Sequence, residues 1–139
     1  MDDLLASGEI TRGQAAWFVL TAAGVLPGGA DAEPAVTGAA AAQARGWLSV
    51  RAKADEPVRL GEVSLLIMKS FGLKGGILYT LFPGPRYACR ELAYLRIIQN
   101  GGDPGGRLDG GQFLQILGNT LTCIGEDEAL AAEEVRRRL

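Results

Sequence analysis

The chain has 139 residues, a formal net charge of −2 and a hydrophobic content of 47%. This length fits a single domain that buries roughly two-thirds of its unfolded surface, and the apolar content supports a packed core. The acidic balance gives no support for nucleic-acid binding, which requires a basic face, and no apolar run reaches the about 20 residues that a membrane span needs.

The stretch ITRGQAAWFVLTAAG, residues 10–24, has the features of a complete helix. Thr11 and Gln14 form a capping-box pattern, in which each side chain accepts a hydrogen bond from the backbone N–H of the other residue. Apolar residues follow at spacings of three and four, which gives the helix one apolar face. Gly24 can adopt the left-handed conformation that ends a helix. We therefore predict a helix over residues 12–23.

The next segments predict a loop and two further helices. Residues 26–35 contain two prolines and two glycines and read as a loop. A second helix is predicted to start near Thr37, with an alanine run that allows a neighbour to approach closely. Residues 61–71 are apolar on nearly every side, which is typical of a central helix. Arg59 stands where a capping threonine is expected, but Glu62 still favours the positive end of the helix dipole.

Residues 74–86, KGGILYTLFPGPR, form an apolar segment that ends in Pro-Gly-Pro and so cannot be a long helix. We predict a loop whose large apolar side chains pack down onto the domain, because in water they would form an exposed apolar patch. The functional alternative is a loop that docks a protein partner. Its candidate docking residues are Ile77, Tyr79 and Phe82.

The C-terminal third predicts three helices. The first covers residues 87–99, and the turn NGGDPGG follows it. The second covers residues 110–121, with Asp109 as N-cap and Gln112 completing a capping box. The third covers residues 126–139, where acidic residues come first and arginines last, in the order that matches the helix dipole.

The helical pattern of the first segment recurs twice in the chain. VRLGEVSLLIMKSFGL begins at residue 58 and LDGGQFLQILGNTL at residue 108, so the three copies follow a period of about 50 residues, typical of a repeated unit. Residues 39–50 and 89–100 match as the second element of the unit. We predict one all-α domain over residues 1–139, with three helix-loop-helix repeats at about 10–50, 58–100 and 108–139. The repeats form a pseudo-threefold bundle, in which the last helix folds back beside the first.

The motif ITRGQ at residues 10–14 resembles the ITRAE signature that opens a helix in S-layer homology (SLH) domains. Those domains carry three such repeats and anchor proteins to envelope polysaccharide. The second copy here has Arg59-Leu60 and the third Asp109-Gly110 in place of Thr-Arg. The resemblance implies a noncatalytic module that binds cell-wall or envelope glycan, located outside the cytoplasm in the periplasm or at the cell surface.

The resemblance also implies a ligand-binding role for the motif arginine, which in that family grips an anionic glycan. A guanidinium suits a carboxylate because it presents paired donors in one plane. Arg12 fills the motif position, and Gln14, Trp17 and Arg59 complete the candidate ligand-binding set. The alternatives are an exposed first-turn arginine for Arg12, helix capping for Gln14 and packing in the core for Trp17.

Nothing in the sequence points to catalysis, a metal or a cofactor. The chain has no histidine, the commonest general base and metal ligand. Residues 101–113 resemble a calcium-binding loop, but Gln112 stands where a bidentate glutamate belongs, which excludes calcium there. Cys89 and Cys123 read as small buried side chains, although one disulfide is open to them in an oxidising compartment. We expect a protein that is not an enzyme.

The N-terminal stretch MDDLLASGE lacks the basic and apolar regions of a signal peptide. In a complete chain this would imply the cytoplasm. We expect instead a fragment of a larger envelope protein, for which the missing signal carries no information. The alternative function is a repurposed SLH-like scaffold that mediates protein–protein interaction in the envelope through residues 74–86.

Overall fold

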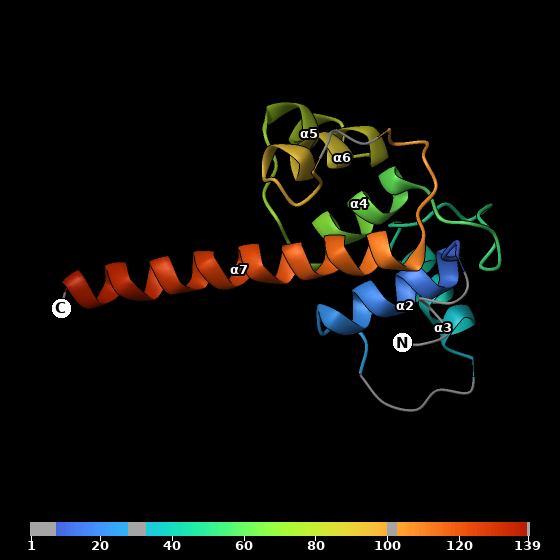
Figure 1. Cartoon of the computed structure of the whole chain (residues 1–139), viewed down its shortest axis with the longest axis horizontal. Helices are drawn as coiled ribbons and strands as arrows, with labels where there is room; N and C mark the ends of the chain where they lie inside the picture. The colour runs from blue at the N-terminus through green and yellow to red at the C-terminus, as the bar shows by residue number, and fades with distance from the viewer. Residues whose placement is uncertain (1–7, 28–32, 100–102, 139) are drawn as a thin grey trace.

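The computed structural model describes residues 8–27, 33–99 and 103–138 of the chain. These ranges are mostly helical and contain no strand, only isolated bridges between extended segments. The prediction of an all-α protein is therefore confirmed. The helices are α2 (Arg12–Ala22), α3 (Pro34–Ala44), α4 (Leu60–Ser70), α5 (Ile77–Leu81), α6 (Pro85–Tyr94) and α7 (Gly110–Arg138) (Figure 1).

Two predicted capping boxes are present and set the starts of α2 and α7. Thr11 Oγ1 accepts from Gln14 N at 3.2 Å, and Gln14 Oε1 accepts from Thr11 N at 3.0 Å. Asp109 and Gln112 exchange the same pair of bonds, at 2.7 and 3.1 Å. At the start of α4 only half of the box remains, in which Arg59 N donates to a Glu62 carboxylate oxygen at 2.9 Å.

Several helix boundaries differ from the predicted ones. α3 begins at Pro34, so Thr37 lies inside the helix and is not its N-cap. Proline suits the first helical position because its missing N–H would have no partner there and its φ is already helical. α6 ends at Tyr94, and Arg96 after it has a positive φ of 62°. The short helix α5 lies within the predicted loop of residues 74–86.

The three extended segments that precede α2, α4 and α7 are hydrogen bonded to one another. Backbone N–H groups at the starts of the helices donate to carbonyls of neighbouring segments: Arg12 to Glu56, Leu60 to Gly106, and Gly110 to Gly8, at 2.9, 2.8 and 3.0 Å. The donors occupy equivalent positions in the three sequence copies, and so do the acceptors. Each extended segment thus leads into one central helix and accepts a hydrogen bond from the first turn of another.

The core lies where α2, α4 and the first half of α7 face one another. The Phe18 and Phe113 rings meet edge to face, with their centroids 6.3 Å apart. The inward-facing residues of the three copies are buried at equivalent positions: Ile10, Ala15 and Val19 in the first copy, Val58, Val63 and Ile67 in the second, and Leu108, Phe113 and Leu117 in the third. Burial of these apolar side chains supplies the main stabilising term of the fold.

Two outer helices cover two of the three central ones. α3 packs on α2, where the backbone of Ala35 lies against Gly13, and α6 packs on α4, where Pro85 lies against Gly61. These glycines allow the close approach, because a Cβ at either position would lie within 3.0 Å of the covering helix.

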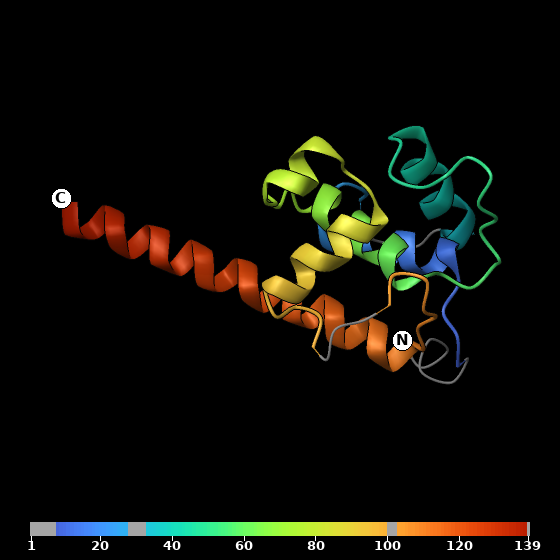
Figure 2. The ribbon, with the colours of Figure 1, turned by 90° about the horizontal axis from the view of Figure 1, so that it is seen from above.

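α7 is one continuous helix of 29 residues, and its C-terminal part projects away from the other helices (Figures 1 and 2). The predicted break between residues 121 and 126, and the predicted return of the last helix beside the first, are therefore wrong. The break has no strong stop signal: Gly125 keeps a negative φ, and a glycine inside a helix costs only about 1 kcal/mol. Residue 139 of the predicted last helix lies outside the described residues.

Candidate functional site

Arg12, the motif arginine, is held by two carboxylates. Its Nε lies 3.0 and 2.9 Å from the two oxygens of Glu62, and its Nη1 lies 3.1 Å from Glu56. The Arg12 and Glu62 side chains are each only 17% exposed. Arg12 therefore joins the first copy to the second, and its charge is matched by carboxylates within the protein. Removing one partner of such a partly buried ion pair is costly, because it leaves the other charge without its partner.

The other three predicted ligand-binding residues are engaged at separate places in the described fold. Gln14 is engaged in the capping box of α2. Trp17 is half-buried, and its backbone lies against Gly38 of α3. Arg59 is exposed and donates from Nη1 to the carbonyl of Gly105 at 2.8 Å. None of these residues, nor Arg12, lines the groove described next.

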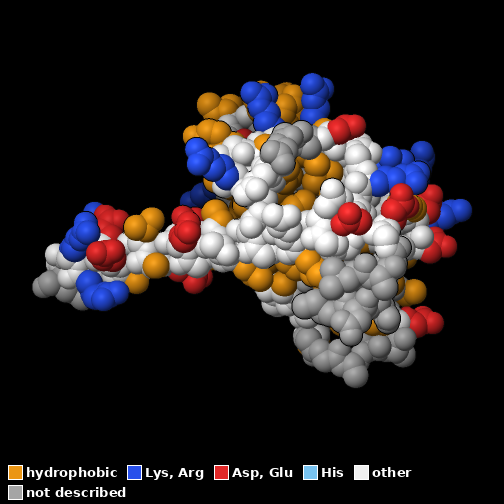
Figure 3. Space-filling model, viewed as in Figure 1, with side chains coloured by type: hydrophobic (Ala, Val, Ile, Leu, Met, Phe, Trp, Pro, Cys, Tyr) orange, Lys and Arg blue, Asp and Glu red, His pale blue; other side chains and the backbone are white. Residues whose placement is uncertain are grey.

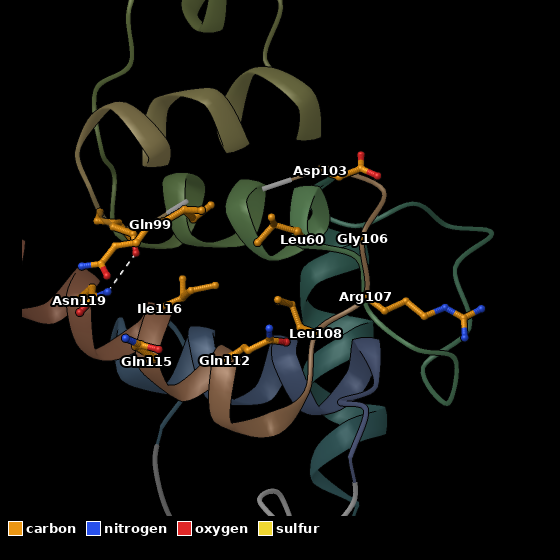
Figure 4. A pocket seen from close by; sticks show the side chains of 12 residues that line it. Leu60, Gln99, Asp103, Gly106, Arg107, Leu108, Gln112, Gln115, Ile116 and Asn119 are labelled. Carbon is orange, nitrogen blue, oxygen red and sulfur yellow. Dashed lines mark hydrogen bonds between the residues drawn. The ribbon is translucent and has the colours of Figure 1, made fainter. Parts of the chain in front are cut away.

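A groove of about 340 Å³ lies between the second and third copies of the motif, bordered by α4, α7 and the segments on either side of residues 100–102 (Figure 4). Three polar side chains on one face of α7 line it, at a spacing of three and four residues. Apolar side chains form part of its wall. Its lining comprises Leu60, Ile97, Ile98, Gln99, Asp103, Gly106, Arg107, Leu108, Gln112, Gln115, Ile116 and Asn119.

This groove occupies the place that an ion pair fills at the junction of the first and second copies. Arg12 and Glu62 correspond by their positions in the motif to Leu60 and Gln112, and both of the latter line the groove. Glu56, the second partner of Arg12, corresponds to Gly106, which also lines it. Charged side chains therefore close the junction between the first and second copies, whereas the equivalent place between the second and third copies is a groove.

The polar groups of the groove are mostly carboxamides, which both donate and accept hydrogen bonds. Asn119 Nδ2 donates to the carbonyl of Ile97 at 3.1 Å, which fixes this side chain at the wall (Figure 4). Gln112 Oε1 is occupied by the N–H of Asp109. Gln99 and Gln115 are exposed to the solvent. Such a lining suits a neutral, hydroxyl-rich ligand better than a strongly charged one.

The sequence contained a signal for this groove, but sequence reasoning did not use it. Gln112, Gln115 and Asn119 recur at the spacing that places side chains on one helix face. Aligning the three motif copies also shows that the first junction pairs an arginine with a glutamate, whereas the second pairs Leu60 with Gln112. The contribution of residues 97–99 and 103–108 comes only from the folded chain.

The prediction that the large apolar side chains of residues 74–86 pack down onto the domain is wrong for most of them. Ile77 is 78% and Phe82 61% exposed, whereas Tyr79 is 6% exposed and packs into the domain. Burial first, and the charge of Glu91 second, raise the pKa of the Tyr79 hydroxyl. Tyr79 therefore holds α5 in place, and of the three predicted docking residues only Ile77 and Phe82 present apolar surface to a partner.

The cysteines are not joined by a disulfide. Cys89 is buried and Cys123 half-buried, and burial is the main cause that raises the pKa of each thiol. Among the described residues, no group of three potential metal-ligating side chains comes together. In the same ranges, no helix has both the length and the apolar content needed to cross a bilayer.

Comparison of the chain with protein-family models, curated proteins and solved structures finds no match. The interpretation of the groove therefore depends on the residues and geometry of this chain.

Proposed function

We propose that this chain is a noncatalytic cell-envelope module that resembles SLH domains and binds an envelope or cell-wall glycan outside the cytoplasm. The proposal includes a three-repeat, pseudo-threefold arrangement of the helices. It is supported by the equivalent hydrogen bonds that join the starts of α2, α4 and α7, and by the equivalent core positions of the three copies.

The open junction between the second and third copies carries the proposal. At this place Leu60, Gln112 and Gly106 replace the charged trio of the first junction and leave a groove. Carboxamides from α7 and from Gln99 surround it. Sugar hydroxyls both donate and accept hydrogen bonds, and carboxamides can satisfy both needs.

The contacts of Arg12 favour a structural role over a ligand-gripping one. Its guanidinium already has carboxylate partners on Glu62 and Glu56, and a glycan carboxylate would have to displace one of them. Binding by Arg12, Gln14, Trp17 and Arg59 stays a prediction, and the groove is the site that we assign first.

Binding to purified envelope polymer tests the proposal. We expect the wild-type chain to cosediment with wall material that retains its attached polysaccharide. The double variant Gln99→Ala/Gln115→Ala removes two exposed carboxamides from the groove, and the loss of two hydrogen bonds should weaken binding by roughly tenfold or more. Thr122→Ala, an exposed polar residue of α7 that does not line the groove, is the matched control.

A second variant tests the comparison of the two junctions directly. Leu60→Arg/Gln112→Glu introduces at the second junction the charged pair that Arg12 and Glu62 form at the first, and the new side chains should fill the groove. We expect this variant to lose polymer binding while circular dichroism shows the wild-type helix content. A wild-type chain that fails to bind the polymer, or groove variants that bind as tightly as Thr122→Ala, would contradict the proposed function.

The exposed side of α5 supports a second candidate function, the docking of a protein partner in the envelope. Ile77, Leu81 and Phe82 are all more than half exposed, and clustered exposed apolar residues mark interaction surfaces. Ile77→Ser/Phe82→Ser should abolish capture of such a partner from an envelope extract and leave polymer binding unchanged. Unchanged capture by this variant would count against the alternative.

A further inference from the structure

We propose that the outer face of α7 is a docking surface for the α7 helix of a second copy of this chain, with the two helices antiparallel. By the α7 outer face we mean Gly111, Leu114, Gly118, Leu121 and Gly125. None of these residues lines the groove between the second and third copies, so the inference is independent of the proposed function.

The first observation is that the equivalent faces of the other two central helices are covered. α3 packs on the first and α6 on the second. Their face residues are buried, whereas the corresponding residues of α7 are exposed or half-buried: Gly13, Ala16 and Leu20 on α2, Gly61, Ser64 and Met68 on α4, and Gly111, Leu114 and Gly118 on α7. The outer face thus has a helix packed on it in α2 and in α4, whereas none of the described helices packs on it in α7.

The glycines show the difference at the level of atoms. A Cβ at Gly13 would lie within 2.5 Å of the backbone of Ala35, and a Cβ at Gly61 would lie 2.9 Å from Pro85. Within the described part of the chain, a Cβ at Gly111 would meet Asp109 of its own cap, at 3.4 Å, and no atom lies within 4 Å of one at Gly118. The α7 outer face therefore keeps the small residues of a helix-packing surface, but none of the described helices packs on it.

The second observation is the absence of charge along this part of α7. The sequence from Gly110 to Gly125 contains no Asp, Glu, Lys or Arg. A helix that turns a face to water normally carries charged residues there. Leu121 on the outer face is 47% exposed, so the surface that faces the solvent here carries no charge and presents a large apolar side chain between glycines.

The spacing of the stripe indicates what covers it. Gly111, Gly118, Gly125 and Ala132 recur every seven residues, and Leu114, Leu121 and Val135 follow the same period. A seven-residue period is the pattern of a helix that packs along another helix. The stripe continues from the domain onto the projecting end of α7, so each half can cover the other half in a two-fold pair, in which both copies use the same surface.

The charges favour the antiparallel direction. In a parallel pair the acidic residues 126–128 of the two copies, and likewise the arginines 136–138, would lie opposite each other. In an antiparallel pair that crosses at Gly125, both charged segments lie opposite uncharged turns of the partner helix, and the arginines come near the N-cap carboxylate of Asp109. Like charges placed opposite one another disfavour an interface, so the antiparallel pair is the better one.

One residue sets the strength of the pair. Glu128 occupies the stripe position between Leu121 and Val135, where a charged group would be partly desolvated. A single helix pair also buries less than the about 800 Å² per partner of a standard interface. We therefore expect a reversible dimer that forms at high protein concentration and that becomes tighter when Glu128 is made apolar.

Sedimentation velocity of the full chain, from low micromolar to near-millimolar concentration, tests the proposal. We expect a concentration-dependent dimer, and association at least tenfold tighter for Glu128→Leu. Leu121→Asp should abolish the dimer. The matched control is Leu130→Asp, which makes the same change nine residues further along, on the opposite side of the helix, at a residue that is 66% exposed. Circular dichroism and thermal unfolding check that each variant is folded.

Crosslinking provides a readout of the geometry. In a Cys123→Ser background, Gly125→Cys lies at the predicted crossing point and should form an intermolecular disulfide under a mild oxidant such as copper phenanthroline. Leu130→Cys, off the stripe, should not. The proposal is overturned by a wild-type chain and a Glu128→Leu variant that both stay monomeric, by equal effects of Leu121→Asp and Leu130→Asp, or by equal crosslinking of the two cysteine variants.

Discussion

The first two copies of the motif and the third share a buried inward face and differ in how their outer side is covered. All three bury the inward face of the central helix, with Ala15, Val63 and Phe113 at equivalent positions and no measurable exposure. On the outer side, α3 and α6 cover the first two copies, whereas α7 continues as one helix into the solvent (Figure 3). The comparison shows that the third copy is held in the domain without a described helix on its outer face, by its buried inward face and by the backbone hydrogen bonds before α7.

The largest contrast is expected for alanine at the equivalent glycines. Gly13→Ala should lower the free energy of unfolding by about 2–4 kcal/mol, because the new methyl group would overlap backbone atoms of Ala35. Gly111→Ala should change it by less than about 1 kcal/mol, toward greater stability, since alanine favours a helix over glycine. Urea unfolding measures both, and equal effects would show that the outer faces are not different.

The second contrast is between two ion pairs. Arg12→Ala should cost about 1–3 kcal/mol of stability, because it leaves the Glu62 carboxylate partly buried and without the guanidinium whose Nε contacts both of its oxygens. Arg107→Ala breaks a 3.4 Å pair with Glu9 in which both side chains are about half exposed, and should cost less than about 1 kcal/mol. The same unfolding experiment compares the two. If the two variants lose similar amounts of unfolding free energy, Arg12 does not stabilise the first junction more than an exposed ion pair would.

A smaller contrast concerns the turn after each outer helix. Gly46 follows α3 with a φ of 74°, and Arg96 follows α6 at the equivalent position with a φ of 62°. Because a side chain is disfavoured in this conformation, Arg96→Gly should stabilise the protein by about 1 kcal/mol, and Gly46→Ala should destabilise it by a similar amount. Thermal unfolding of the pair is the measurement, and a loss of stability in Arg96→Gly would contradict the equivalence of the two turns.

The smallest effect distinguishes Cys89 on α6, which packs on α4, from Cys123 on the projecting helix α7 by thiol chemistry. A disulfide-exchange reagent at mildly alkaline pH should label the half-buried Cys123 first, and Cys89 only when the protein unfolds. Both should react more slowly than a small free thiol at the same pH. The raised pKa of each thiol means that less of the reactive thiolate is present until the pH rises further. Cys89 reacting as fast as Cys123 in the native protein would contradict the burial of the Cys89 side chain between α6 and the core.

The sequence was sufficient where structure depends on neighbouring residues. The Thr11–Gln14 and Asp109–Gln112 boxes form as predicted, because all their groups lie within four residues of one another. The all-α class and the helical copies follow from periodicity in the same way. Thr37 was misassigned as an N-cap because two helix-start signals compete there, and the proline three residues earlier is the one that the chain uses.

The sequence was insufficient where distant segments decide the outcome. Nothing local shows whether α7 breaks near Gly125, since the cost of a helical glycine is small beside the packing energy that a return would have to gain. The exposure of Ile77 and Phe82 likewise depends on how α5 sits on α6. The groove combines α7 with two loops and α4, and Arg12 is matched by carboxylates about fifty residues away, so their arrangement follows only from the fold.

The hydrogen bonds from Gly110 to Gly8 and from Ile10 to Leu108 join the beginning of the described chain to the start of its last helix. Contacts between residues about a hundred positions apart carry the entropy cost of closing a long loop, and such contacts slow folding. During synthesis, α2 would leave the ribosome well before α7. Until α7 follows, the extended segment before α2 would lack its hydrogen bonds to residues 108 and 110. A fusion or cleavage that displaces Gly8 and Glu9 should therefore remove the bond from Gly110 and loosen the start of α7, while the buried face of α7 still holds it against α2 and α4.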